Sequence, residues 1–157
     1  MDKNTIIAIA AVLIFLFLFI TAQSPPRPTG MSAMPENDRE FLKWAISTSE
    51  ITKSHMLDID RAGKSNDSKN MTIHGKFLRL DTEKFLNKSK QFNVSDPLKS
   101  SLENIQKSYN YFNLAGKYIE IGANNSGMES LRTAMNYANQ GGEYMADVAI
   151  YVQNYMD

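Results

Sequence analysis

The stretch "MTIHGKFLRLDTEKFLNKSKQF", residues 71–92, carries an apolar residue at every seventh position. The members of this series are Met71, Leu78, Phe85 and Phe92, and Phe77 lies beside them. A seven-residue apolar repeat forms a stripe along one face of an α-helix, as in helices that pack in bundles. We therefore expect a helix over residues 68–91 whose stripe faces other helices.

The segment before this stretch has the apolar spacing of a helix from residue 37 to residue 63. Asn37 followed by Glu40 resembles a capping box, and Gly63 supplies a stop signal. The positions that follow this spacing are Phe41, Ala45, Ile46, Thr48, Ile51, Met56 and Ile59. Because the connection to the next helix is short, the two helices are expected to run antiparallel.

A third helix is expected over residues 97–122. Asp96 is the predicted N-cap, Pro97 suits the first helical position, and Gly122 is a C-terminal stop. Its apolar positions are Leu98, Leu102, Ile105, Tyr109, Phe112 and Ile119.

A fourth helix is expected over residues 127–155, since Ser126 and Glu129 form an S-x-x-E capping box. Its apolar positions are Leu131, Met135, Ala138, Met145, Val148 and Val152. No segment of the chain shows sustained period-two alternation, so no sheet is expected. The prediction is an all-α fold in which residues 37–157 form an antiparallel up-down four-helix bundle.

The N-terminal residues 1–22 contain "TIIAIAAVLIFLFLFITA", residues 5–22, which has no charged side chain. As a helix this segment is about 27 Å long, close to the thickness of a bilayer core of about 30 Å. It is longer than the apolar region of most signal peptides, and Ile20 and Pro25 do not suit cleavage after Ala22 or Ser24. We therefore expect an uncleaved transmembrane anchor, with a cleaved signal and a secreted product as the alternative.

The anchor is followed by a proline-rich linker, residues 23–36, which holds four of the five prolines. Prolines at this density prevent a helix and favour extended chain, so the linker is expected to be a stalk. In this arrangement the loops at 63–67 and 123–125 lie far from the membrane, and the 93–95 loop lies near it.

Charges flanking the anchor are nearly balanced and do not decide its orientation. Five Asn-X-Ser/Thr sequons favour a domain outside the cytoplasm that carries glycans. The candidate glycosylation residues are Asn66, Asn70, Asn87, Asn93 and Asn124. The alternative is a polar surface that is merely rich in Asn and Ser.

Tyrosine is unevenly distributed, because all seven tyrosines follow residue 93. Residues 36–92 hold eleven basic and nine acidic side chains, whereas residues 93–157 hold four and seven. Heptad spacing places five tyrosines on helix faces, and tyrosine is enriched at protein interfaces. The candidate interaction face is Tyr111, Tyr118, Tyr137, Tyr144 and Tyr151. The alternative is that these rings fill the core and its rim.

An internal similarity joins the last two helices. "NYFNLAGKYI", residues 110–119, matches "NYANQGGEYM", residues 136–145, at five positions. Gly116, Gly141 and Gly142 each cost a helix about 1 kcal/mol relative to alanine. Such glycines indicate either close helix approach or space for a ligand or a neighbouring chain.

The sequence offers little support for catalysis or for a cofactor. His55 and His74 are expected in one layer with Asp58 and Asp81, but their spacing matches no metal motif. There is no cysteine, no nucleophile elbow and no phosphate-binding glycine loop. Seventeen basic residues balance seventeen acidic ones, which argues against nucleic-acid binding. No catalytic, cofactor or metal residue is therefore assigned.

The leading hypothesis is a membrane-anchored, extracytoplasmic, non-enzymatic domain that acts by protein–protein binding or self-assembly at the cell surface. Its partner would be a second copy of the chain or another envelope protein. One alternative is a ligand-sensing or solute-binding ectodomain that works with a partner. A lesser alternative is a pilin-like filament subunit.

Overall fold

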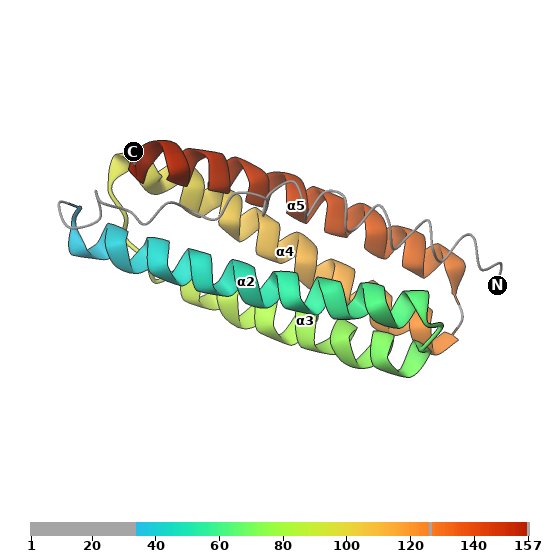
Figure 1. The fold of residues 1–157 in the computed structure, drawn as a ribbon. Coiled ribbons are helices and arrows are strands. Elements are labelled where there is room, and N and C mark those ends of the chain that lie inside the picture. Colours follow the sequence, from blue (N-terminus) through green and yellow to red (C-terminus); the bar gives the residue numbers. More distant parts are fainter. Residues whose placement is uncertain (1–33, 126, 157) are drawn as a thin grey trace.

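The computed structural model describes residues 34–125 and 127–156, with side chains through residue 152, and these residues form four long helices without a strand. The helices are α2 (Glu36–Lys64), α3 (Ser68–Ser89), α4 (Asp96–Asn125) and α5 (Met128–Met156). They lie side by side and alternate in direction along the chain (Figure 1). The predicted all-α fold of four helices is confirmed. The predicted transmembrane helix over 5–22 lies outside the described residues.

The start of α2 differs from the predicted capping box. Pro35 precedes the helix, no side chain caps it, and the Arg39 N–H donates to the Pro35 carbonyl oxygen at 3.1 Å. The first turn therefore begins at Glu36, and Asn37 lies inside the helix, where it cannot act as N-cap. The predicted stop at Gly63 is also one residue early, because Asn66, with φ of 55°, supplies the left-handed backbone that follows α2.

The ends of α3 were predicted more closely. The Asp67 carboxylate accepts the Asn70 N–H at 3.0 Å and caps the N-terminus of this helix. The helix ends at Ser89, two residues before the predicted end at residue 91.

Two predictions for the ends of α4 were wrong. Asp96 is the first helical residue rather than the N-cap, and its carboxylate pairs with Lys99 at 2.6 Å. Gly122 does not stop the helix, which continues to Asn125. A Cβ at Gly122 would lie 2.7 Å from Leu131 Cγ, so glycine is needed there for close contact with α5. The predicted cap at Ser126 lies outside the described residues.

Consecutive helices pack against one another along their length, and α2 also reaches α4 through Tyr109. Tyr109 is fully buried, its hydroxyl lies 2.5 Å from Thr48 Oγ1, and burial raises its pKa. Around it, Phe41, Trp44 and Phe92 form an aromatic cluster whose neighbouring ring centroids are 4.9 to 6.1 Å apart. Each half of the chain therefore contributes rings to one core.

The predicted apolar stripe of α3 is only partly buried. Leu78 is fully buried, and Met71, Phe85 and Phe92 are half-buried against the core. Phe77, which was grouped with this stripe, is 47% exposed. One residue along a helix turns the side chain by about 100°, which carries Phe77 from the inner stripe to the outer side.

The helices α3 and α4 approach each other closely where they cross at Gly75 and Gly116. A Cβ on Gly116 would lie 2.6 Å from the Gly75 carbonyl oxygen and 2.7 Å from the Arg79 nitrogen, so the two backbones touch here. Two hydrogen bonds flank the contact: Asn113 Nδ2 donates to the Arg79 carbonyl oxygen at 2.8 Å, and Arg79 Nε donates to Glu120 Oε1 at 2.6 Å. Close helix approach, predicted from Gly116, is confirmed.

A buried carboxylate joins α2 to the loop before α4. Asp38 has no exposed surface, and its two oxygens accept the Ser95 N–H at 2.8 Å and the Ser95 hydroxyl at 2.6 Å. This contact lies at the end of the bundle that holds the start of α2, the 90–95 loop and the end of α5 (Figure 1). We call this the near end, and the end with the α2–α3 and α4–α5 connections the far end.

Candidate functional site

Four of the five tyrosines predicted to form an interaction face lie in one row across α4 and α5. The ring of Tyr111 stacks on Tyr144 with centroids 5.8 Å apart and an interplanar angle of 7°, and on Tyr137 at 6.2 Å. Tyr118 extends the row with its centroid 5.6 Å from that of Tyr137. The heptad spacing of each pair put its rings on one helix face, and the antiparallel pairing of the helices brings the two faces together.

The row lies between the core and solvent. Tyr111, Tyr118, Tyr137 and Tyr144 are half-buried, and Tyr118 and Tyr137 pack against the core cluster. Tyr151, the fifth predicted member, is 38% exposed and lies two turns beyond Tyr144 on α5. The structure therefore places the predicted residues at the rim of the core with their outer edges accessible.

Two stripes of residues with heptad spacing border the contact between α4 and α5. None of their fourteen members is buried, and only Lys107 and Asp147 are charged. The α4 stripe is Asn104, Lys107, Tyr111, Leu114, Tyr118, Ile121 and Asn125. The α5 stripe is Ser130, Thr133, Tyr137, Gln140, Tyr144, Asp147 and Tyr151. We call this surface the tyrosine seam.

Lys107 and Asp147 are members of the seam that the sequence did not single out. Lys107 Nζ lies 5.4 Å from the centroid of the Tyr144 ring, in a cation–π contact. Asp147 is exposed one turn beyond Tyr144, and no salt bridge to it occurs among the described residues. Extending the tyrosine heptads by three or four residues along each helix would have found both.

The opposite hairpin has a different outer surface, rich in charged side chains. His55 Nε2 donates to Asp81 Oδ2 at 3.0 Å, and His74 Nδ1 lies 3.8 Å from Asp58 Oδ2. Partial burial acts to raise the pKa of Asp81, but hydrogen bonds from Lys84 and His55 outweigh it and hold that pKa below its ordinary value. The His55–Asp81 hydrogen bond ties α2 to α3, whereas His74 lies near Asp58 without a hydrogen bond to it.

The predicted proximity of the histidines to the aspartates is therefore present as two separate pairs. The exposed ring of Phe77 lies between them, with its centroid 6.1 Å from that of each imidazole. Within the described residues, no three His, Cys, Asp or Glu side chains are grouped so as to hold a metal ion.

The glycines of α4 and α5 were predicted to provide either close packing or space. Beside Gly116 the space is filled by the backbone of α3, and beside Gly141 it is filled by the Phe112 ring, 3.2 Å from a Cβ at that position. Gly142 differs, because apart from its chain neighbours and the nearby backbone of α5 no heavy atom of the described residues lies within 4 Å of a Cβ placed there. Two of the three glycines thus serve packing.

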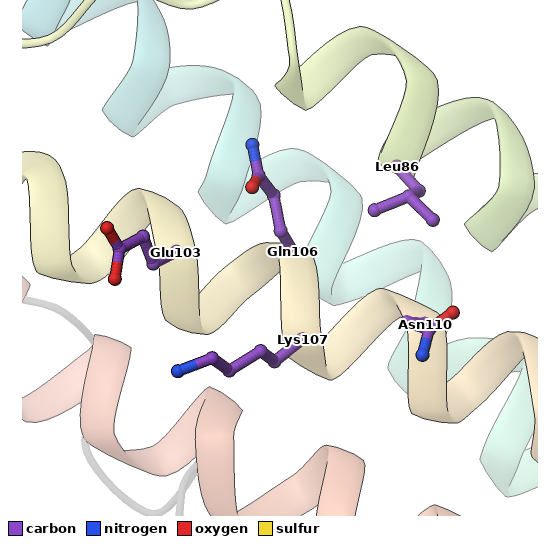
Figure 2. A pocket seen from close by; sticks show the side chains of 5 residues that line it. All are labelled: Leu86, Glu103, Gln106, Lys107 and Asn110. Carbon is purple, nitrogen blue, oxygen red and sulfur yellow. The ribbon is translucent and has the colours of Figure 1, made fainter.

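A shallow groove of about 390 Å³ lies on the outer side of α4 near α3. Leu86 comes from α3, whereas Glu103, Gln106, Lys107 and Asn110 come from α4, and Lys107 extends toward the side of α5 (Figure 2). The groove holds one carboxylate, one ammonium group and two amides, and it does not adjoin Gly116 or Gly141.

All five sequon asparagines are exposed. Three lie at the far end, where Asn70 Nδ2 donates to Asp67 Oδ2 at 2.6 Å and Asn124 Oδ1 accepts from the Thr72 hydroxyl at 3.1 Å. The other two, Asn87 and Asn93, lie toward the near end. Their exposure leaves room for glycans without disturbing the core.

Comparisons of the chain with protein-family models, curated proteins and solved structures return no match. Among the helices of residues 34–125 and 127–156, none has both the length and the apolarity needed to cross a bilayer.

Proposed function

We propose that this chain is a membrane-anchored, extracytoplasmic binding domain that acts by protein–protein contact through the tyrosine seam and has no enzymatic activity. The observation that carries the proposal is the seam itself. It is a continuous surface of fourteen accessible residues that includes five tyrosines and only two charges. Protein interfaces are enriched in tyrosine and depleted of charged side chains at their centres, and this surface has both properties.

The contacts within the seam also prepare it for binding. Because Tyr111 stacks on both Tyr137 and Tyr144, each ring restricts the rotamers of its neighbours. A surface that is already ordered loses less side-chain entropy when a partner binds. Aromatic side chains at the centre of an interface are the ones that most often dominate the binding energy.

The membrane part of the proposal rests on sequence. Residues 5–22 are uncharged and long enough for a bilayer, and the proline-rich linker separates them from α2. An anchor before α2 would put the near end toward the membrane and the far end away from it. Three of the five sequons, at Asn66, Asn70 and Asn124, would then lie at the end farthest from the bilayer.

Photocrosslinking in membranes tests the binding role. A photoreactive amino acid at Gln140, in the middle of the α5 stripe, is expected to give a defined crosslinked product in vesicles from producing cells. The same amino acid at Lys76, which is exposed on α3, serves as the matched control. Tyr111→Ala combined with Tyr144→Ala is expected to abolish the Gln140 product. Equal crosslinking at both positions, or none at Gln140, would contradict the proposal.

The mass of the membrane-extracted protein tests the anchor and the export. We expect an intact N-terminus and additional mass from glycans on the sequons. A chain that begins after residue 22 and is washed from membranes by alkaline carbonate would show that the segment is a cleaved signal. An intact chain without glycan mass would remove the support that the sequons give to export.

Solute binding is a second candidate function, and the groove beside Leu86 supports it. Glu103 and Lys107 offer charges of both signs there, and Gln106 and Asn110 offer amides, a set that suits a small zwitterionic molecule such as an amino acid. Titration calorimetry with a panel of amino acids tests this role, and Glu103→Ala is expected to abolish any binding. If an amino acid binds the original chain and the Glu103→Ala variant shows no heat of binding, the result would favour the solute-binding role over binding through the seam.

A further inference from the structure

We infer that the partner of the tyrosine seam is a second copy of this chain, bound seam to seam with both bundles pointing in the same direction. The two-fold axis of this dimer runs parallel to the helices. This inference rests on the proposed function and specifies its partner.

The two charges of the seam carry the inference. Lys107 lies on the α4 stripe and Asp147 on the α5 stripe, so they flank the seam on opposite sides. They are also at similar heights along the bundle, because Lys107 Nζ reaches the Tyr144 ring and Asp147 lies one turn beyond Tyr144. Apart from the cation–π contact, neither charge has an ionic partner among the described residues.

A two-fold axis along the helices places α4 of one copy opposite α5 of the other at equal height. Lys107 of each copy then faces Asp147 of its partner, and the pair forms twice. This reciprocity is the property of an isologous interface, in which one surface is complementary to itself. The uncharged remainder of the seam places tyrosine, leucine and isoleucine edges against each other.

The opposite orientation of the second copy does not satisfy these charges. Both Lys107 and Asp147 lie in the half of the seam toward the near end, whereas the half toward the far end holds Ile121, Asn125, Ser130 and Thr133. An antiparallel dimer would place each charge against these uncharged residues. Charge complementarity therefore selects the parallel dimer, which is also the arrangement open to two chains anchored in one membrane.

The size of the seam is sufficient for such a dimer. From Asn104 to Asn125 it extends about 32 Å along α4, and two helices of about 10 Å diameter make it about 20 Å wide. An area of about 600 Å² on each copy gives about 1,200 Å² in total, at the lower limit for specific protein complexes. Anchoring in one membrane raises the effective concentration of the second copy and compensates for an interface of modest size.

Charge exchange on the full chain, reconstituted in lipid vesicles or in detergent micelles, tests the inference. Lys107→Asp places two aspartates against each other on both sides of the dimer, and Asp147→Lys does the same with lysines. Each single variant is expected to weaken dimerisation about tenfold, measured by sedimentation or by energy transfer between labelled copies. The double variant is expected to restore it to within about threefold of the original chain. Lys76→Asp, the same charge change on exposed α3, is expected to have no effect.

Cysteine crosslinking tests the direction, because the chain has no cysteine of its own. In the parallel dimer, Asn125 on α4 of one copy lies opposite Ser130 on α5 of the other, so a mixture of the Asn125→Cys and Ser130→Cys variants is expected to form a disulfide between the two variants. In a mixture of the Asn104→Cys and Asn125→Cys variants, whose cysteines face each other only in the antiparallel dimer, no disulfide between the two different variants is expected. If that mixed disulfide were the main product, the parallel arrangement would be overturned.

The outcomes separate this inference from the proposed function. A chain that stays monomeric in vesicles, or a dimer that neither single charge variant weakens, would overturn self-pairing through the seam. The proposed function would survive that result if photocrosslinking at Gln140 still joins the chain to a different protein. It would fail only if Gln140 gave no specific product.

Discussion

Gly116 provides the strongest test of the packing described above, because its substitution by alanine has two opposed effects of known size. Alanine is favoured over glycine inside a helix by about 1 kcal/mol. Against this, a Cβ at Gly116 would lie 2.6 Å from the Gly75 carbonyl oxygen, whereas ordinary contact begins at 3.4 Å. The neighbouring atoms belong to the backbone of α3, so α3 and α4 must move apart by about 0.8 Å.

Overpacking of a core typically costs 1–3 kcal/mol, and a clash with backbone lies at the upper end of about 3 kcal/mol. Separation of the helices also lengthens the hydrogen bonds that Arg79 makes with Asn113 and Glu120. After the gain of about 1 kcal/mol from helix propensity, Gly116→Ala is expected to lower the free energy of unfolding by about 2 kcal/mol. At about 4 °C per kcal/mol, the midpoint of thermal unfolding should fall by about 8 °C.

Trp44 reports this unfolding, because it is the one tryptophan of the chain and lies 4.9 Å from Phe92 within the aromatic cluster. Urea titration of the full chain in a mild detergent, followed by its fluorescence, measures the change. Gly142→Ala is the matched control, because a Cβ there meets no atom within 4 Å apart from its chain neighbours and the nearby backbone of α5, so this variant should gain about 1 kcal/mol. If both substitutions change stability in the same direction, backbone contact at Gly116 is not the reason for its glycine.

Three further variants test other contacts of the fold. Thr48→Val removes the hydroxyl partner of buried Tyr109 and should lower the free energy of unfolding by about 1–3 kcal/mol. Tyr109→Phe should lower it by only about 1 kcal/mol, because the Thr48 hydroxyl keeps its hydrogen bond to the Trp44 carbonyl oxygen. Urea titration of both variants gives the comparison. Ser95→Ala removes a hydrogen bond to the buried Asp38 carboxylate and should cost about 2 kcal/mol in the same titration, against no change for exposed Ser100→Ala. Burial raises the pKa of Tyr109, so above pH of about 10 the unfolded chain releases this proton before the folded chain does, and stability should fall by up to about 1.4 kcal/mol per pH unit. Tyr109→Phe should remove that part of the alkaline loss, and identical slopes for the two chains between pH 9 and about 11 would refute the assignment.

The four helices and their order could be predicted from the sequence because apolar periodicity is a local property. The apolar periodicity also assigned Tyr109 to the inner side of its helix and Tyr111 to a different face, because two residues along a helix turn the side chain by about 200°. Tyr109 falls in phase with Leu98 and Ile105 and is buried, whereas Tyr111 falls on the outer edge. Periodicity was less precise for Phe77, because the stripe of every seventh residue was extended to a neighbouring residue that lies about 100° from it around the helix.

Contacts between distant segments could not be predicted in this way. Asp38 and Ser95 are far apart in sequence, and each taken alone resembles an ordinary helix-end residue. Their pairing follows from the lengths of α2 and α3 and from the path of the 90–95 loop, which small differences in helix ends can change. Helix ends themselves depend on which of two or three candidate caps makes a hydrogen bond, and the capping box at Asn37 shows that the motif alone does not decide this.

The packing of α4 on α5 explains why the tyrosines lie at the surface. The Phe112 ring rests directly on the backbone at Gly141, and the Ser108 hydroxyl donates to the Gly141 carbonyl oxygen at 2.7 Å. The buried positions of these two helices include small residues, such as Ala115 and Ala138, and helices in such close contact accommodate large rings more readily at the edge of the contact. The rings of Tyr111 and Tyr144 are therefore displaced to the outer edge of the contact, where they stack on each other. The close approach of α4 and α5 requires glycine at position 141, and the same close approach leaves the tyrosine rings at the seam. Gly141 and the tyrosine seam are therefore parts of one arrangement.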